Sequence, residues 1–321
     1  MEAARALDYP PDKLEILVAR GKQPSAQRNT AIKAARGELI CFLDDDALTR
    51  PDHLRRAVVH FGDPTVKVVG GPNVCPPDAP NLEQVFALVL SSWLAFGPSR
   101  ARYVPVGGVR PTGEKELILC NLVARRAALI ECGGFNEALY PNEENALMDE
   151  LQARGGKLLY DPELVVCRRP RRTLGAFAKM LRTYGRGRAE QFRVTPTFGS
   201  TLNFVPPLFL IYLLTLPVVW NLSLPTAWQR LLMFYTLPLG FYVMVVFVQI
   251  VAFMSRGGFI RSLCALPLIV LTHGLYGFGF WHGLFTKLKA PTEATKLPVQ
   301  LEHVSLRNDQ PPLVQSRSEL R

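Results

Sequence analysis

Hydrophobic residues follow two different patterns along this chain, and the pattern changes near residue 200. Before that point, short apolar runs alternate with segments of helical periodicity. Apolar runs at 14–19, 39–43 and 66–70 predict buried strands, and the segments between them, 25–35 and 51–61, predict helices, with Ser25 as the N-cap of the first. Strands that alternate with helices predict an α/β fold in which mostly parallel strands are joined by right-handed crossovers.

The α/β pattern continues to about residue 195. A further strand is predicted at 117–123, a turn at Gly133-Gly134-Phe135, and a helix at 142–154 that ends before two glycines. The apolar stretch 85–96 is too short to cross a bilayer, which needs about 20 residues, so it predicts a core or interfacial helix.

The last third of the chain contains long uncharged runs. Three of them, at about 202–221, 231–254 and 262–285, approach the length of roughly 20 apolar residues that a bilayer requires. Prolines in the first run leave open that it is kinked or re-entrant, which would leave two spans. Gly279 and Gly283 form a small-x-x-x-small pattern, for which we predict packing within the chain rather than dimerisation. His273 and His282 have no nearby carboxylates, so we interpret them as interfacial or packing residues rather than as metal ligands.

These patterns divide the chain into three predicted parts. They are an α/β domain at 1–195, a membrane region of about three helices at 200–286, and a polar, disordered tail at 287–321. The formal net charge is +10, and between Arg168 and Arg193 nine basic residues stand against one acid. Such a cluster beside an apolar run favours membrane lipid headgroups or a pyrophosphate over nucleic acid, which we do not expect as a partner.

The six cysteines show neither a C-x-x-C pair nor histidines at zinc spacing, so we expect reduced thiols. Candidate chemistry instead begins at Asp44-Asp45-Asp46, directly after the predicted strand 39–43. In open α/β sheets, ligands bind beyond the carboxyl ends of the strands. Carboxylates there suit a divalent cation that neutralises a diphosphate. The alternative is a solvated acidic turn ahead of the helix at Pro51.

Two segments carry a family resemblance. Residues 24–46 read PSAQRNTAIKAARGELICFLDDD, and a second match combines CNLVARR at 120–126 with GGFNE at 133–137. In order and spacing they resemble the family 2 glycosyltransferases of the GT-A fold. The resemblance implies a GT-A catalytic domain followed by transmembrane helices, and an inverting, hexosyltransferase-like enzyme. It also implies a nucleotide-sugar donor, a lipid-linked or glycan acceptor, and Mg²⁺ or Mn²⁺ as cofactor.

The resemblance also assigns roles to residues. Asp44 and Asp45 would contact the donor, and Asp46, with Asp44, would hold the metal. Arg28, Asn29 and Asn121 would lie near the nucleotide. The family's catalytic base is the acid of an E-D pair that opens a helix after the G-G-F turn. The matching residues are Glu143 and Glu144, so we predict Glu144 as the base, although two glutamates in a first turn also stabilise the helix dipole.

A processive synthase is not expected, because the segment 182–188 lacks the glutamine and tryptophan of the Q-x-x-R-W motif. Arg186 and Arg188 in this segment are candidate contacts to pyrophosphate or lipid phosphate, or simply membrane-surface charge. The predicted location is a bacterial inner membrane, crossed more than once, with a cytoplasmic catalytic domain.

The chain also departs from the family pattern. The opening strand with its base-binding motif is missing, and Ala19-Arg20 stands where an acid is usual. We therefore predict a start that lies upstream of Met1. Two other functions stay open: a membrane-anchored binding or scaffold protein on a degenerate domain, and a metal-dependent nucleotidyltransferase.

Overall fold

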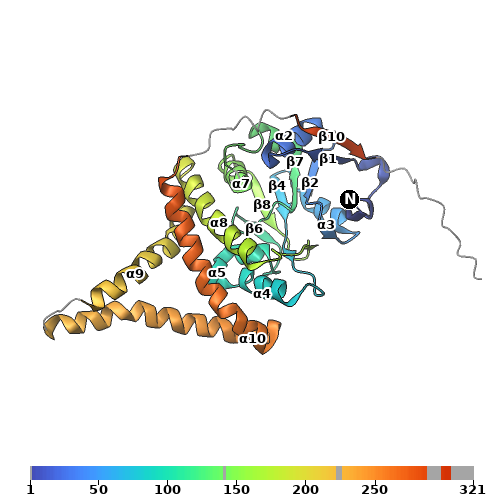
Figure 1. Ribbon diagram of the computed structural model, residues 1–321. Coiled ribbons are helices and arrows are strands. Elements are labelled where there is room, and N and C mark those ends of the chain that lie inside the picture. The colour runs from blue at the N-terminus through green and yellow to red at the C-terminus, as the bar shows by residue number, and fades with distance from the viewer. Residues whose placement is uncertain (1, 140–141, 222–225, 288–297, 305–321) are drawn as a thin grey trace, which may run out of the picture.

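The computed structural model describes residues 2–139, 142–221, 226–287 and 298–304. It contains an α/β domain followed by long apolar helices, two of which project from the domain (Figure 1). Predicted strands 39–43 and 66–70 are present with these bounds as β2 (Leu39–Leu43) and β4 (Val66–Gly70).

The main sheet has five strands, and it is mixed rather than mostly parallel. Its order is β2-β7-β4-β8-β6, where the added strands are β7 (Asn121–Arg125), β8 (Lys157–Tyr160) and β6 (Arg110–Thr112). β4 and β8 pair in parallel, whereas β7 pairs antiparallel with both β2 and β4, and β6 pairs antiparallel with β8. The prediction of mostly parallel pairing was therefore wrong, because burial on both faces marks a central strand but does not encode its direction.

The first predicted strand lies outside this sheet. β1 (Ile16–Arg20) pairs antiparallel with β10 (Gln300–Val304), which comes from the segment predicted to be a polar tail. An exposed ion pair between Arg20 and Glu302, 3.2 Å apart, joins the two strands. The rest of the predicted tail, apart from 287 and 298–299, lies outside the described residues.

A third, small sheet lies beside the aspartate run. It contains β3 (Leu48–Thr49), β9 (Val166–Cys167) and β5 (Asn73–Val74), in the order β3-β9-β5. β3 follows Asp44–Asp46 closely in sequence, and Arg168 follows β9 directly. This sheet therefore brings Arg168 towards the aspartates.

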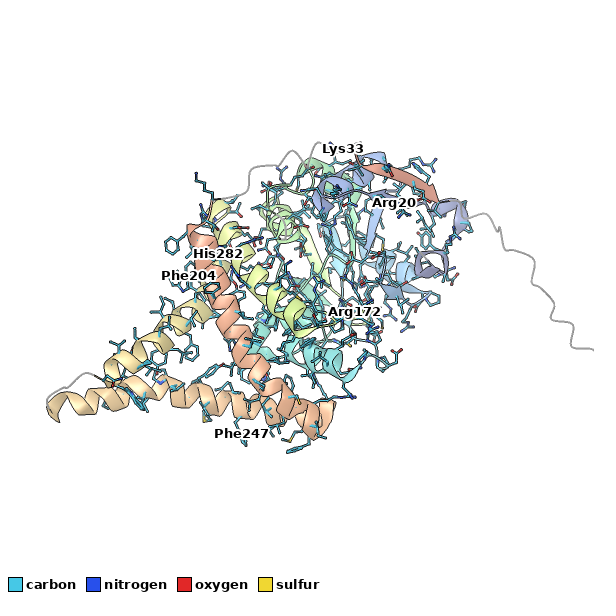
Figure 2. The ribbon with its side chains drawn as sticks, viewed as in Figure 1. Arg20, Lys33, Arg172, Phe204, Phe247 and His282 are labelled. Carbon is cyan, nitrogen blue, oxygen red and sulfur yellow. The ribbon has the colours of Figure 1, made fainter. Side chains whose placement is uncertain are left out.

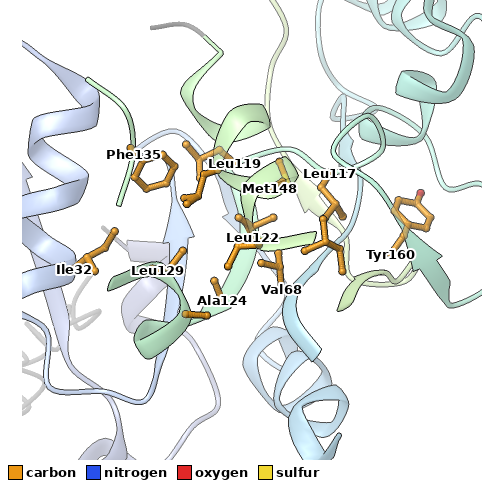
Figure 3. Packing of buried hydrophobic residues seen from close by; sticks show 14 of the residues in the cluster. Ile32, Val68, Leu117, Leu119, Leu122, Ala124, Leu129, Phe135, Met148 and Tyr160 are labelled. Atoms are coloured by element: carbon orange, nitrogen blue, oxygen red, sulfur yellow. The ribbon is translucent and has the colours of Figure 1, made fainter. Parts of the chain in front are cut away.

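Helices cover both faces of the main sheet. On one face, α2 (Pro24–Ala34), α6 (Arg126–Glu131) and α7 (Glu143–Ala153) contribute Ile32, Leu129 and Met148 to a buried cluster with strand residues such as Leu122 (Figure 3). A second cluster includes Ala57 of α3 (His53–Val59) and Val69 of β4. The predicted cap of α2 was wrong by two residues. The side chain of Gln23 accepts the cap hydrogen bond from the Ala26 amide, whereas Ser25 lies buried in the first turn.

The C-terminal helices are α8 (Leu174–Val194), α9 (Val205–Trp220) and α10 (Thr226–Phe285). Within the described part of the chain, two helical segments are long and apolar enough to cross a membrane, Gly199–Trp220 and Phe234–Phe285. α10 changes direction at Gly258, whose φ of 71° is outside the helical region. We call 226–257 its first arm and 259–285 its second arm. The predicted apolar runs at 231–254 and 262–285 thus fall on the two arms of one bent helix.

The second arm runs alongside α8 at very short range (Figure 1). A Cβ atom built on Gly279 would lie 2.1 Å from the Arg182 carbonyl oxygen, and one on Gly283 would lie 2.5 Å from that of Arg186. From the other side, a Cβ on Gly185 would lie 2.0 Å from the Tyr276 oxygen. The predicted packing of the small residues within the chain is thereby confirmed.

Two short helices join α10 to the α/β domain. These are α4 (Asn81–Leu90) and α5 (Trp93–Phe96), in the apolar stretch predicted to form a core or interfacial helix. The Phe86 ring stacks on Phe177 of α8 with centroids 4.3 Å apart, and the Ser92 hydroxyl donates to Gln249 of the first arm at 2.9 Å. The outer side of the first arm stays uncovered, as Figure 2 shows for Phe247, which is 66% exposed.

Candidate active site

The carboxylates that follow β2 converge on one guanidinium group. Nη1 of Arg168 lies 2.6 Å from Oδ2 of Asp44, and Nε of Arg168 lies 2.6 Å from Oδ1 of Asp46. Asp45 is exposed. Two residues of the predicted triplet therefore point to a common position, and a cationic group of this chain occupies it.

Arg168 stays charged in this position. Burial works against its charge, but the carboxylates of Asp44 and Asp46 outweigh that effect and raise the pKa of Arg168. Burial also raises the pKa of the neighbouring Cys120 thiol, to about 12, which favours its neutral form. Cys120 is therefore neutral and adds no charge beside the aspartates.

The second candidate group lies at the start of α7. Glu143 is 1% exposed, and its Oε1 is 2.5 Å from Nη1 of Arg28 on α2. Burial and the charge of Glu144 outweigh Arg28, and together they raise the pKa of Glu143 to about 7. Burial also raises the pKa of Glu144, against the opposing effect of Arg102. The helix start thus carries two carboxyl groups that bind protons more tightly than an ordinary glutamate.

A buried polar network surrounds this helix start. The Arg102 guanidinium donates to the Asn145 side chain at 2.5 Å and lies 3.7 Å from Glu114. Glu114 also accepts from Arg188 of α8 at 2.9 Å. Both arginines therefore share one carboxylate of the same chain, and they hold the helix start against α8.

A cavity of about 590 Å³ opens beside Glu144. Its polar end includes Arg102, Lys115, Asn142, Glu144 and Arg188. Its remaining wall is largely apolar and comes from α5, α8, α9 and both arms of α10, including Leu94, Leu181, Phe209, Phe241, Val245 and Tyr276. One carboxyl group therefore faces a space that is apolar over most of its length.

His273 lies in the cavity wall between the helices. Its Nδ1 is 2.9 Å from the Tyr242 hydroxyl and its Nε2 is 3.2 Å from the Leu94 carbonyl oxygen. Because a carbonyl only accepts, Nε2 carries the proton and Nδ1 accepts from Tyr242. Both ring nitrogens are thus used in packing contacts, as the sequence predicted for this residue.

One short segment connects the cavity with the aspartates. Ile118 lines the cavity, Cys120 interacts with Asp44 and Arg168, and Asn121 pairs with Leu43, the residue before Asp44. The amide of Asn121 donates to the Ile118 carbonyl, so the segment turns tightly. The segment 118–121 therefore reaches the cavity at one end and the aspartates at the other.

The three predicted nucleotide contacts are engaged within the protein. Asn29 holds the turn before α7, since its Nδ2 donates to the Phe135 carbonyl at 2.9 Å and its Oδ1 accepts from the Phe135 amide at 2.8 Å. Arg28 pairs with Glu143 as above. Asn121 is 0% exposed and donates to two main-chain carbonyls, those of Pro72 and Leu164. The roles of these three residues at the nucleotide stay predictions.

The structure separates the two candidate phosphate contacts. Arg188 lines the cavity, whereas Arg186 pairs with Glu190 one turn further along α8, at 3.3 Å, and is not a lining residue. Lys115, which sequence reasoning missed, also lines the cavity. Burial lowers the pKa of Lys115, and its ammonium donates to the Gly199 carbonyl oxygen.

The aspartates fit a divalent cation of the kind that accompanies a diphosphate. Mg²⁺ in such sites is held by only one or two carboxylates, with phosphates and water as the other ligands. Asp44 and Asp46 supply two carboxylates that already grip one cationic group. Across the described part of the chain, no cluster of three or more His, Cys, Asp or Glu side chains forms a metal site by itself. A cation here would therefore take its remaining ligands from water or from the phosphates of a ligand.

Comparison with known proteins finds a similar family for the first third of the chain. Residues 3–103 match the sequence model described as Glycosyl transferase family 2. The match covers about a third of the chain, and over these residues the chain is similar to glycosyl transferase family 2. The predicted fold class, a GT-A type α/β domain followed by apolar helices, is confirmed in these terms.

Two curated relatives are similar over a longer stretch. Both are the Pre-mycofactocin glycosyltransferase of Mycobacterium tuberculosis, from two strains, and each is 30% identical over 145 residues. The match covers 45% of this chain but only 30% of the relative, so the chain spans under a third of those proteins.

A solved structure is more distant. The mannosyltransferase PcManGT from Pyrobaculum calidifontis, in complex with GDP-Man and Mn²⁺, is 17% identical with a TM-score of 0.41. The alignment covers 83% of this chain and 67% of that one. At this TM-score the two chains differ too much in arrangement for a residue-by-residue comparison.

Sequence reasoning missed the partner of the aspartates. Arg168 was counted only as one member of the basic cluster, although it directly follows the short apolar run Val165-Val166-Cys167. A basic residue at the end of a predicted strand, like the aspartates themselves, marks the ligand-binding edge of a sheet. The apolar cavity left no such signal, because its wall combines helices that are distant in sequence.

Proposed function

We propose that the protein is an inverting glycosyltransferase, which transfers a sugar from a nucleoside-diphosphate sugar to an acceptor hydroxyl. One observation carries this proposal: the paired carboxylates of Asp44 and Asp46 and the cavity with Glu144 adjoin the two ends of one short segment, 118–121. A donor held by its diphosphate at one end and an acceptor in the cavity at the other would meet there. The match to glycosyl transferase family 2 supports the same reading.

Glu144 is the proposed base. As the acceptor oxygen attacks C1 of the sugar, the carboxylate of Glu144 takes the hydroxyl proton, the new C1–O bond forms, and the bond from C1 to the diphosphate oxygen breaks. The electron pair of that bond leaves with the diphosphate; a Mg²⁺ or Mn²⁺ held by Asp44 and Asp46 would supply the positive charge that stabilises it. Attack from the face opposite the leaving group inverts C1. The raised pKa of Glu144 makes it a stronger base than a solvated glutamate.

The proposed acceptor carries its hydroxyl on an apolar body, as in a lipid-linked acceptor. The cavity wall from α9 and α10 is largely apolar, and only its end near Glu144 is polar. Arg102 and Arg188 there share the single carboxylate of Glu114, and Lys115 adds a third cation, which forms no ion pair in the described part of the chain. These three cations outnumber the carboxylates of Glu114 and Glu144, so an acceptor with an anionic group near its hydroxyl would find a net positive charge at this end.

We further propose attachment to a membrane through a helical hairpin. α9 begins beside the α/β domain at Phe204, projects outward, and the first arm of α10 returns to the domain (Figures 1 and 2). Both ends of the hairpin then lie on one side, where Arg256, Arg261 and the basic residues of α8 also lie. An excess of arginine is typical of the cytoplasmic side, so we assign the α/β domain to it. In this topology the second arm packs on α8 and is not a third span.

Release of nucleoside diphosphate and binding of the nucleotide sugar together test the function. The full chain, purified in detergent, is incubated with Mn²⁺ and a panel of nucleotide sugars, and released nucleoside diphosphate is measured with and without membrane lipid extract. We expect release from one donor class that depends on Mn²⁺ and increases with the lipid extract. Binding of a nucleotide sugar without any release would instead favour a non-catalytic binding protein, and release of pyrophosphate would favour a nucleotidyltransferase.

A further inference from the structure

The guanidinium of Arg168 lies where a metal between Asp44 and Asp46 would lie. Its two contacts, Nη1 to Oδ2 of Asp44 and Nε to Oδ1 of Asp46, are both 2.6 Å long. A divalent cation at the same carboxylates uses the same oxygen atoms, and its charge repels the guanidinium at that distance. The metal and the arginine therefore compete for one position.

The main chain at Arg168 is fixed, so only its side chain can yield. The Arg168 amide donates to the Val74 carbonyl oxygen at 3.0 Å, within the small sheet. The next residue, Arg169, forms a two-point ion pair with Glu83, whose side chain is 3% exposed. Breaking that pair would leave a buried carboxylate without its partner, which is strongly destabilising. These contacts anchor the backbone on both sides of Arg168.

The Arg168 side chain itself is free to move on one side. It is 28% exposed, and Asp46 beyond it is 53% exposed, so solvent reaches the bridge. A guanidinium binds phosphate oxygens through two parallel hydrogen bonds and keeps its charge at every ordinary pH. A diphosphate bound through a cation at Asp44 and Asp46 would place such oxygens directly beside the displaced group.

We propose that Arg168 exchanges partners when the donor binds: it neutralises Asp44 and Asp46 in the free protein and binds the donor diphosphate once a metal takes its place. This inference rests on the proposed function, because it requires a diphosphate ligand. The metal alone must displace Arg168 without compensation, whereas the metal and the diphosphate together give Arg168 a new anionic partner. Metal binding and nucleotide binding are therefore coupled, and the coupling is reciprocal.

The first arm of the test is metal binding without nucleotide. Arg168→Gln removes the competing charge, and Arg171→Gln is the matched control, because it removes an equal charge from an exposed position three residues away. Binding of Mn²⁺ to the full chain in detergent is followed by the electron paramagnetic resonance signal of free Mn²⁺. We expect Arg168→Gln to bind Mn²⁺ about tenfold more tightly than the wild type, a typical coupling magnitude, and Arg171→Gln to match the wild type.

The second arm is nucleotide binding at saturating Mn²⁺. Calorimetric titrations first identify which of UDP, GDP, ADP, CDP and dTDP the wild type binds. Arg168→Gln should bind that nucleotide about tenfold more weakly. Arg171→Gln should bind it with the affinity of the wild type. Arg168→Lys keeps the charge but lacks the planar fork of the guanidinium, so it should hold the two carboxylates less tightly, gain affinity for Mn²⁺ and lose less for the nucleotide. It also provides a second variant if the glutamine substitution unfolds the protein.

The outcomes separate this inference from the proposed function. If the wild type binds a nucleotide with Mn²⁺ but Arg168→Gln gains nothing for Mn²⁺ alone, the exchange of partners is refuted and the function stands. If Arg168→Gln binds Mn²⁺ more tightly than the wild type but binds the nucleotide with unchanged affinity, the contact between Arg168 and the diphosphate is refuted. If the wild type binds none of the nucleotides, the proposed function itself fails.

Discussion

The close contact between α8 and the second arm of α10 predicts opposite effects on stability for alanine substitutions at two glycines of that arm, Gly279 and Gly274. Gly279→Ala would place a Cβ atom 2.1 Å from the Arg182 carbonyl oxygen, a backbone atom that cannot rotate away. Since real contacts of this kind are not shorter than 3.0 Å, the two helices must separate by about 0.9 Å locally. At Gly274, nothing lies within 4 Å of the added atom.

The expected magnitudes follow from these contacts. Overpacking costs typically about 1–3 kcal/mol, so Gly279→Ala should lower the free energy of unfolding by that amount. Gly274→Ala should raise it by roughly 0.5–1 kcal/mol, because alanine loses less conformational freedom than glycine in a helix. Thermal unfolding of the full chain in one detergent, followed by circular dichroism, compares both variants with the wild type. Equal shifts of the same sign would refute the close packing of α8 against α10.

Three further predictions concern the candidate site. Asn29→Ala removes the hydrogen bonds that hold the turn at Phe135. At roughly 1 kcal/mol per bond, it should lower the free energy of unfolding by about 2–3 kcal/mol. An unchanged midpoint in chemical denaturation would contradict this role of Asn29. Burial raises the pKa of Glu143 from 4.5 to about 7, so the folded state holds this proton more tightly than the unfolded state. Its contribution to stability is therefore fully present below pH 4.5 and is lost as the pH rises to about 7. Glu143→Gln should remove this dependence of the free energy of unfolding on pH, when unfolding is measured across that range. Because Glu144 must be ionised to act as a base and burial raises its pKa, kcat/KM should fall on the acidic side at a pH above the ordinary glutamate value; a rate unchanged down to pH 4.5 would argue against this assignment.

The sequence was sufficient for the local elements that periodicity and caps specify. β2 and β4 have the predicted bounds, because each is a short β-branched or apolar run that ends at aspartates or glycines. The helix at Glu143–Ala153 and the intramolecular role of Gly279 and Gly283 were also predicted correctly. These features depend on residues that are close in sequence.

Long-range pairing was not predictable in the same way. Nothing in Asn121–Arg125 specifies that this strand inserts antiparallel between β2 and β4, and nothing in Gln300–Val304 specifies β1 as its partner. Only Glu144 and Arg188 of the cavity residues were expected to carry a function. The ion pairs of Arg168 depend on two strands that are more than a hundred residues apart in the chain, a contact that periodicity does not encode.

The central claim is that Glu144 removes the proton from the acceptor hydroxyl beside a metal-bound donor. It is tested most directly by the rate of sugar transfer in Glu144→Gln, with Glu150→Gln, an exposed residue of the same helix, as the matched control. We predict that Glu144→Gln loses at least about a hundredfold in kcat, the usual contribution of a general base, while it binds the donor with unchanged affinity, and that Glu150→Gln retains the full rate. A Glu144→Gln variant that transfers sugar at the rate of the Glu150→Gln control would contradict the account.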